Sequence, residues 1–256
     1  MSAAMDGKKL LVIGGRSGIA QQIAADALIA GAHVVLAGRD QKAIDAAVAR
    51  IAHDHAAGGA QGSDAATIGE RVRGATVDLT DEDSIRMLAE QTGDLDYLVS
   101  VAAAHANGPV AQLDRTAITR AFDAKVIGPL LLAKHVAPQI RTGGAILLFS
   151  GVAAWRPTPE RAVMATTNGA VAFLAEALAV ELAPIRVNAL SPGIVDSGAW
   201  DKMGPTKDQF FTNVATTIPA RRIGHPSDIS AAALLTLTNP FLTGTTLHID
   251  GGGHLT

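Results

Sequence analysis

The chain has 256 residues, of which 48% are hydrophobic and 18% charged, so it can bury the core of one large domain. Its 21 basic and 24 acidic residues leave a formal charge of -3, too small and too mixed to favour a nucleic acid or a membrane surface as partner. The absence of cysteine excludes disulfides, thiolate nucleophiles and cysteine-based metal sites. We therefore expect a small-molecule partner and a cytoplasmic location.

Seven short apolar runs alternate with helical patterns. The first run, residues 10–13, precedes a glycine turn and a helix with Ile19, Ile23 and Ala27 spaced four apart. Continuous apolar runs between helices are typical of parallel strands that are covered on both faces. The sequence therefore predicts one α/β domain over residues 1–256, a Rossmann-type doubly wound parallel sheet of about seven strands with helices on both faces. The later runs are residues 33–37, 75–79, 97–101, 145–149, 185–190 and 247–249.

Three further segments carry separate predictions. Residues 56–66 are rich in alanine and glycine, which predicts a loop, most simply a tolerated surface insertion. Residues 162–183 are apolar, but Asn168, Glu176 and Glu181 interrupt them, so we expect a buried helix rather than a membrane span. Residues 197–218 combine Gly, Pro and Thr with aromatic side chains, which predicts either a substrate lid or two short packed helices.

A glycine-rich turn follows the first predicted strand and opens a helix. Glycine allows a tight reversal and lets the backbone approach a pyrophosphate closely. The helix then presents free N–H groups and the positive end of its dipole to the anion. The pattern therefore predicts a dinucleotide site. Its expected cofactor-binding residues in this turn are Gly14, Arg16, Ser17, Gly18 and Ile19.

Arg39 ends the second strand, about twenty residues after the turn, where NAD-binding proteins usually have an acid for the ribose hydroxyl. An arginine there pairs with a 2′-phosphate instead, and Arg16 is a second cation for the same group. Asp40 is expected to cap the next helix. The sequence thus favours NADP(H) as cofactor; the alternative for Arg39 is an ordinary surface residue.

Several ordered motifs resemble the short-chain dehydrogenase/reductase family over nearly the whole chain. The glycine turn, the Val-Asp-Leu-Thr segment at residues 77–80, the Arg-Val-Asn-Ala-Leu-Ser-Pro-Gly segment at 186–193 and the Asp-Gly-Gly at 250–252 carry the likeness. The resemblance implies an adenine contact at Asp78 and a nicotinamide contact at Ser197. It also implies a homo-oligomer, either a dimer or a tetramer. The further cofactor-binding residues that it implies are Leu79, Ala102, Asn168, Pro192, Gly193 and Ile194.

The catalytic tetrad of that family is missing. The positions of its Asn, Ser, Tyr and Lys fall on Lys125, Gly151, Met164 and Asn168 respectively. The only tyrosine, Tyr97, starts the fourth predicted strand, far from the edge where such sheets bind ligands. Since methionine has no transferable proton, a phenol cannot be the proton donor at Met164.

The exchange of Asn and Lys between two positions suggests substitute roles. Lys125 is a candidate proton donor if burial lowers its pKa, and the alternative is a partly exposed interface or solvated residue. Asn168 is expected to bond the ribose hydroxyls, above an apolar floor at Met164. His105 is a weaker candidate donor. No metal site is predicted, because His53, His55 and His248 lack partners at ligand spacing.

The leading hypothesis is an NADP(H)-binding oxidoreductase that moves a hydride between nicotinamide and a small carbonyl or alcohol, or an imine or alkene, with a non-standard proton donor. The alternative is a catalytically inactive NADP(H)-binding homologue that acts as a sensor or partner subunit. A scaffold that no longer binds nucleotide is a third class, disfavoured by the glycine turn and Arg39.

Overall fold

The structure is a computed structural model that describes residues 5–57 and 69–256. The loop predicted at residues 56–66 therefore lies almost wholly outside the described residues. The described residues form one parallel sheet in the order β3-β2-β1-β4-β5-β6-β7, which confirms the predicted fold. Its strands are β1 (Lys9–Ile13), β2 (His33–Gly38), β3 (Val72–Thr76), β4 (Leu95–Ser100), β5 (Ile140–Phe149), β6 (Arg186–Pro192) and β7 (Thr246–Ile249).

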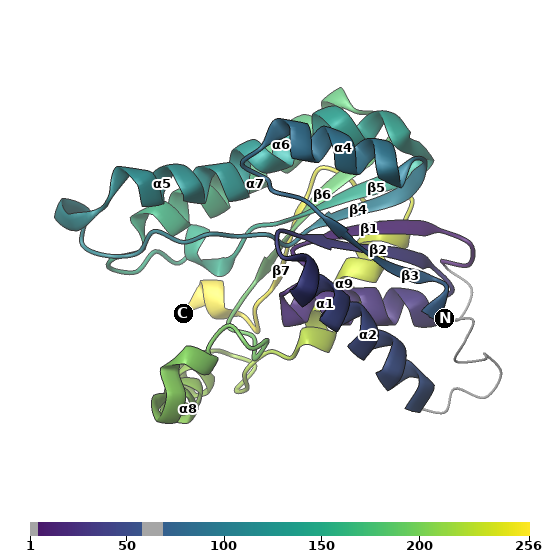
Figure 1. The fold of residues 1–256 in the computed structure, drawn as a ribbon. Helices are drawn as coiled ribbons and strands as arrows, with labels where there is room; N and C mark the ends of the chain where they lie inside the picture. Colours follow the sequence, from purple (N-terminus) through teal and green to yellow (C-terminus); the bar gives the residue numbers. More distant parts are fainter. Residues whose placement is uncertain (1–4, 58–68) are drawn as a thin grey trace.

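Helices cover both faces of this sheet (Figure 1). On one face lie α1 (Gly18–Ile29), α2 (Gln41–Ala57) and α9 (Pro226–Thr238). The other face is covered by α4 (Glu82–Thr92), α5 (Arg115–Phe122), α6 (Gly128–Val136) and α7 (Ala162–Glu181). Neighbouring strand residues point to opposite faces, so Leu10 and Val12 pack in one core and Leu11 and Ile13 in the other. This alternation is why the apolar runs are continuous.

The third strand lies earlier than the sequence predicted. We expected residues 75–79, whereas β3 spans Val72–Thr76. Val77 and Leu79 are buried, which makes the apolar pattern continue past the strand. The backbone leaves the sheet at Asp78, whose N–H donates to the Ser84 hydroxyl at 3.0 Å and whose carboxylate accepts from Thr80. These local hydrogen bonds to side chains replace the pairing with the next strand and so end β3, which is a common effect of Asp, Ser and Thr.

Helix α7 is long and apolar enough, by length and composition alone, to cross a membrane. In this structure it packs Val171, Ala175 and Leu178 into the core beneath the sheet. Apolar residues on a helix that faces a sheet serve burial, so its composition is that of a core helix. This packing agrees with the predicted buried helix.

The region at residues 197–218 forms a 3₁₀ segment at Asp201–Thr206 followed by α8 (Lys207–Thr217). In Figure 1, α8 stands apart from the sheet on the segment that follows β6. Trp200 packs on Phe210 with ring centroids 4.9 Å apart, and its indole N–H donates to the Val195 carbonyl at 3.1 Å. The segment is thus a pair of short helices with its own aromatic cluster; its opening as a lid stays a prediction.

Candidate cofactor and active site

The glycine turn lies between the ends of β1 and β4. Gly14 has a φ of +100°, and a Cβ there would meet the Ala102 backbone nitrogen at 2.9 Å. Both facts require glycine at this position. The turn therefore lies directly against the segment that follows β4, so Gly14 and Ala102, predicted from separate motifs, are neighbours.

Helix α1 begins immediately after this turn with its first N–H groups available. Ser17 precedes it with extended backbone angles, no described side chain caps it, and its first turn holds no acidic residue. The amide of Gln21 donates to the Gly15 carbonyl at 2.9 Å, which fixes the turn to the helix. An uncapped helix start next to close-packed glycines fits a pyrophosphate, which would accept hydrogen bonds from these N–H groups.

Gly18 places the loop after β6 on the same turn. A Cβ at Gly18 would lie 2.5 Å from the Ser197 backbone oxygen. This contact brings together two more residues that were predicted independently to bind the cofactor. Near the start of the loop, Gly193 packs on Asp250. A Cβ added at Gly193 would lie 2.8 Å from the Asp250 Cα.

Replacing Gly18 by alanine should lower the free energy of unfolding by about 1–3 kcal/mol, because a backbone oxygen cannot yield as a side chain would. Urea unfolding measures this change. The matched control is Gly169→Ala in α7, where no described atom lies within 4 Å of the added Cβ. There the change should raise stability by about 0.5–1 kcal/mol, since alanine is the better helix former. Equal effects at the two sites would contradict the contact.

The expected adenosine end lies at the ends of β2 and β3. Arg16 and Arg39 are both exposed, and Asp40 accepts from the Ala43 N–H at 3.1 Å, which confirms it as the cap of α2. The Asp78 carboxylate accepts from the Thr80 N–H and hydroxyl, each at 2.9 Å. The backbone hydrogen bond from Thr80, mainly, and the charge of Arg39 hold the pKa of Asp78 below its usual value. Asp78 is therefore an ionised acceptor near Arg39.

Lys125 is buried, with 7% of its surface exposed, in a π-helical segment at Asp123–Ile127 between α5 and α6. Its Nζ donates to the Ser150 carbonyl at 3.1 Å, and the Ser150 hydroxyl donates to the Asn168 carbonyl at 2.7 Å. Burial lowers the pKa of Lys125 to about 8. The alternative of a partly exposed lysine is thus wrong: the insertion of one residue in the helix turns this side chain inward, which helical periodicity does not predict.

Asn168 fills the space beside Gly151. A Cβ on Gly151 would meet the Asn168 Nδ2 at 2.9 Å, while the Asn168 Oδ1 is buried without a hydrogen-bond partner among the described atoms. Gly151 has an extended φ of 169°, so space rather than backbone strain is what a side chain lacks there. Met164 lies half-buried one helical turn before Asn168. Gly151 and Asn168, the positions at which the resemblance led us to expect a Ser and a Lys, therefore lie side by side.

Replacing Gly151 by serine should cost about 1–3 kcal/mol of stability, because the buried amide must move. In an Asn168→Ala background the space is free and this cost should disappear. A double-mutant cycle in urea measures the coupling energy between the two sites. Additive effects would show that the residues do not share this space.

Two further candidates differ in position. His105 is an exposed residue in the loop after β4; partial desolvation, first, and the charges of Lys125 and Arg161 lower its pKa. It is therefore near the buried lysine and favours the neutral imidazole. Tyr97 lies in the core, 6% exposed, and burial raises the pKa of its phenol. The only tyrosine of the sequence thus packs in the hydrophobic core, in agreement with the predicted structural role.

Comparisons with known proteins agree with this geometry. Residues 13–254 match the model of a protein family described as enoyl-(acyl carrier protein) reductase. The short-chain dehydrogenase/reductase ucsE of Acremonium sp is 34% identical, over 97% of this chain and 96% of that protein. The human dehydrogenase/reductase SDR family member 4 is 30% identical, over 96% of this chain and 87% of that protein.

Solved structures give the same result. A reductase/Diels-Alderase, MalC of Malbranchea aurantiaca, superposes with a TM-score of 0.90 at 26% identity, covering 100% of this chain and 99% of that one. A small-chain dehydrogenase in complex with NADPH has a TM-score of 0.77 at 28% identity, covering 98% and 100%. The fold and the arrangement of the site are those of the NAD(P)-dependent oxidoreductases. Within this class, the chain belongs to the short-chain dehydrogenase/reductase family.

Proposed function

We propose that this protein is an NADP(H)-dependent reductase that acts on an alkene conjugated to a carbonyl, with Lys125 in place of the usual phenol. The observation that carries the proposal is the buried ammonium of Lys125, which donates to the Ser150 carbonyl; the Ser150 hydroxyl in turn donates to the backbone carbonyl of Asn168. A buried cation is costly to a fold, so its presence beside two positions of the family's active site supports a chemical role.

The residues present fit the cofactor. The glycines at positions 14 and 18 leave room that a Cβ would fill, and the start of α1 offers N–H groups to the pyrophosphate. Arg39 and Arg16 would bind the 2′-phosphate, and Asp78 would accept from the adenine amino group. The Asn168 amide would meet the nicotinamide ribose. When bound, the reduced cofactor supplies the hydride.

The substrate class follows from the missing acid. Reduction of a simple ketone needs a proton on its oxygen as the hydride arrives, and no phenol is present for this. When a hydride adds to an alkene conjugated to a carbonyl, the negative charge spreads onto the oxygen, where an ammonium stabilises it. The description of the matching family, enoyl-(acyl carrier protein) reductase, supports this class. Lys125 would hold the positive charge and then donate the proton.

A single-turnover experiment tests the proposal. The purified full chain is mixed with NADPH deuterated at C4 and, separately, with a cyclic enone, a simple ketone and a cyclic imine. We expect the enone to react fastest, with deuterium on its β carbon. Faster reduction of the ketone would overturn the substrate class, and NADPH binding without turnover of any substrate would overturn the reductase assignment.

The second candidate is a non-catalytic NADP(H)-binding sensor or partner subunit. The observation that favours it is the crowding of Asn168 against Gly151, where a serine side chain would fit only if the Asn168 amide moved. Binding without turnover in the experiment above is the result that this candidate predicts.

We also propose that the chain forms a homo-oligomer. Large apolar side chains are exposed on α6, on α7, on α9 and just after α9, which supports burial against another copy. Light scattering on the purified chain measures the assembly. These residues are Leu130, Phe173, Val180, Leu235 and Phe241.

A further inference from the structure

Three side chains capable of binding a metal meet at the end of β7, outside the Lys125 site. They are His248 within the strand, Asp250 directly after it and His254 in the 3₁₀ turn Gly253–Leu255. Each offers one ligand atom, and these atoms lie within 4.8 Å of one another. The spacing of six residues between His248 and His254 does not by itself predict a pair, because it brings two side chains together only if the chain turns back.

The backbone supplies that turn. Gly251 and Gly252 have φ values of +64° and +79°, which favour glycine. The Asp250 carboxylate accepts from the N–H groups of Gly252 at 2.9 Å and His254 at 3.0 Å. These bonds fold His254 over His248, so that their rings stack with centroids 4.3 Å apart. The cluster is therefore fixed by local hydrogen bonds rather than by chance proximity of flexible side chains.

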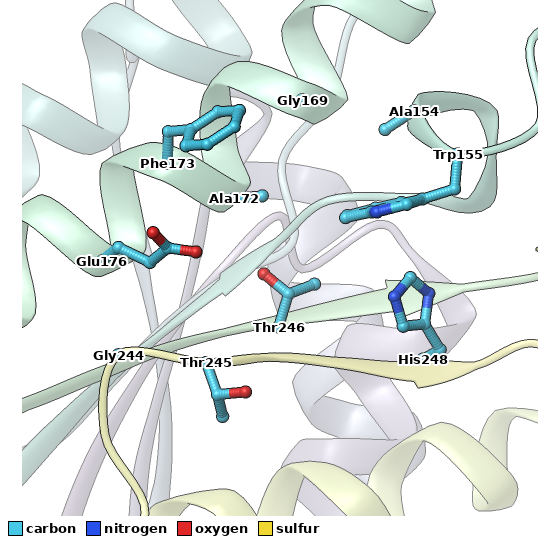
Figure 2. A pocket seen from close by; sticks show the side chains of 10 residues that line it. All are labelled: Ala154, Trp155, Gly169, Ala172, Phe173, Glu176, Gly244, Thr245, Thr246 and His248. Atoms are coloured by element: carbon cyan, nitrogen blue, oxygen red, sulfur yellow. The ribbon is translucent and has the colours of Figure 1, made fainter.

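The three groups have the chemistry of metal ligands. The Asp250 side chain is only 2% exposed, and its Oδ2 accepts from the Nδ1 of His254 at 2.7 Å. Trp155 packs edge-on against His248 at 4.5 Å and holds the imidazole at one end of a hollow, as Figure 2 shows. The Nδ1 of His248 is buried with no hydrogen-bond partner among the described residues. A buried polar atom without a partner is costly, and a bound cation would satisfy it.

We propose that His248, Asp250 and His254 bind a divalent transition metal ion, with Zn²⁺ as the best match. Two imidazole nitrogens and one carboxylate oxygen form a three-residue set of the kind that zinc takes when a fourth position stays open. Tetrahedral bonds of about 2.0–2.2 Å place ligand atoms about 3.4 Å apart. That spacing lies between the 2.7 Å that separates Asp250 Oδ2 from His254 Nδ1 and the 4.8 Å within which all three ligand atoms lie. All three residues line a cavity of about 600 Å³, which gives the ion access and leaves room for a water as fourth ligand.

Metal binding there would act on the loop after β6. The Asp250 backbone packs on Gly193, and the Gly193 N–H donates to the Ile249 carbonyl at 3.1 Å. Gly193 begins the loop that reaches the glycine turn through Ser197. An ion that holds the end of β7 would therefore stabilise the wall of the cofactor site. This inference does not depend on the proposed reaction, because it concerns only the binding of a cation.

Zinc binding to the untagged full chain tests the proposal. A fluorescent chelator competes for Zn²⁺, and melting is followed with and without Zn²⁺. The variants are His248→Gln and His254→Gln, and the control is His33→Gln, at an exposed position at the start of β2. Because no described group is hydrogen-bonded to the His248 Nδ1, His248→Gln removes a ligand without breaking a bond of that atom.

We expect one Zn²⁺ per chain and a raised melting temperature in the wild type and the control. Each variant should bind at least about tenfold more weakly, since even loss of a group that only orients a ligand costs that much. Co²⁺ should give the visible absorption of a four- or five-coordinate site, lost in both variants. No binding by the wild type would overturn the proposal, and so would equal affinity in His248→Gln and the wild type.

Discussion

Lys125→Met should raise the stability of the protein and at the same time lower its turnover about 100-fold, the lower end of what proton transfer contributes. The pKa of Lys125 falls from 10.5 to about 8 on burial, which corresponds to a cost of about 3 kcal/mol for the charged form. Methionine avoids this cost but leaves the Ser150 carbonyl without its donor, which costs about 1 kcal/mol. The net gain at pH 7 should be about 2 kcal/mol.

The pH dependence of the stability gain tests whether the buried charge of Lys125 is its cause. The folded pKa of Lys125 lies below that of the unfolded chain, so between pH 8 and 10.5 the unfolded state binds more protons. The burial cost is thus fully present below about pH 8 and disappears as the pH rises to 10.5. The stability gain of Lys125→Met, measured in urea, should shrink over the same range. A gain that is constant with pH would mean that packing, not charge, is its cause.

The turnover rate should fall with rising pH, whereas an enzyme that uses a general base becomes faster as that base loses its proton. An ammonium donor must be protonated, so the rate of the wild type should fall as the pH rises through about 8. The Lys125→Met variant should not show this fall in rate near pH 8. The matched control is Lys134→Met on α6, an exposed lysine whose ion pair with Glu82 contributes little. His105→Gln separates the two candidate donors: unchanged turnover in Lys125→Met with loss in His105→Gln would assign the role to the histidine.

Arg39→Ala should weaken NADPH binding by about 10- to 100-fold and leave NADH binding nearly unchanged. A hydrogen bond to a charged group contributes about 1.5–3 kcal/mol, and only NADPH has the 2′-phosphate that Arg39 would bind. Titration of nucleotide fluorescence measures both affinities. The control is Arg50→Ala, an exposed arginine in α2. Equal losses for the two nucleotides would place Arg39 away from the 2′-phosphate and remove the basis for preferring NADP(H).

Periodicity and turn chemistry predicted most of the fold. Five strands lie within about two residues of the predicted runs and Asp40 caps α2, because burial on both faces and capping are recorded in the local sequence. The start of β5 was wrong: the strand begins at Ile140, five residues before the predicted run at 145–149. The end of β3 was wrong by three residues, since Val77 and Leu79 are buried without being in the sheet. Burial and strand pairing are separate properties, and the apolar pattern reports only the first.

The candidate site was less predictable where it depends on contacts between distant residues. The motifs identified the glycine turn and Ser197, but not that Gly18 and Ser197 touch. They suggested a role for Lys125, whereas its burial follows from a π-helical segment that no residue spacing reveals. The contact between Asn168 and Gly151 also depends on tertiary packing. The meeting of His248 with His254 depends on the local turn at Gly251 and Gly252.

Calorimetric titration of the purified chain with NADPH and with NADH, beside a folding check by circular dichroism, tests the central claim most directly. The structure, with free N–H groups at the start of α1 and Arg39 near Asp78, predicts tight binding of NADPH at one site per chain and much weaker binding of NADH. A well-folded chain that gives no heat with NADPH, or that binds NADH as tightly as NADPH, would contradict it.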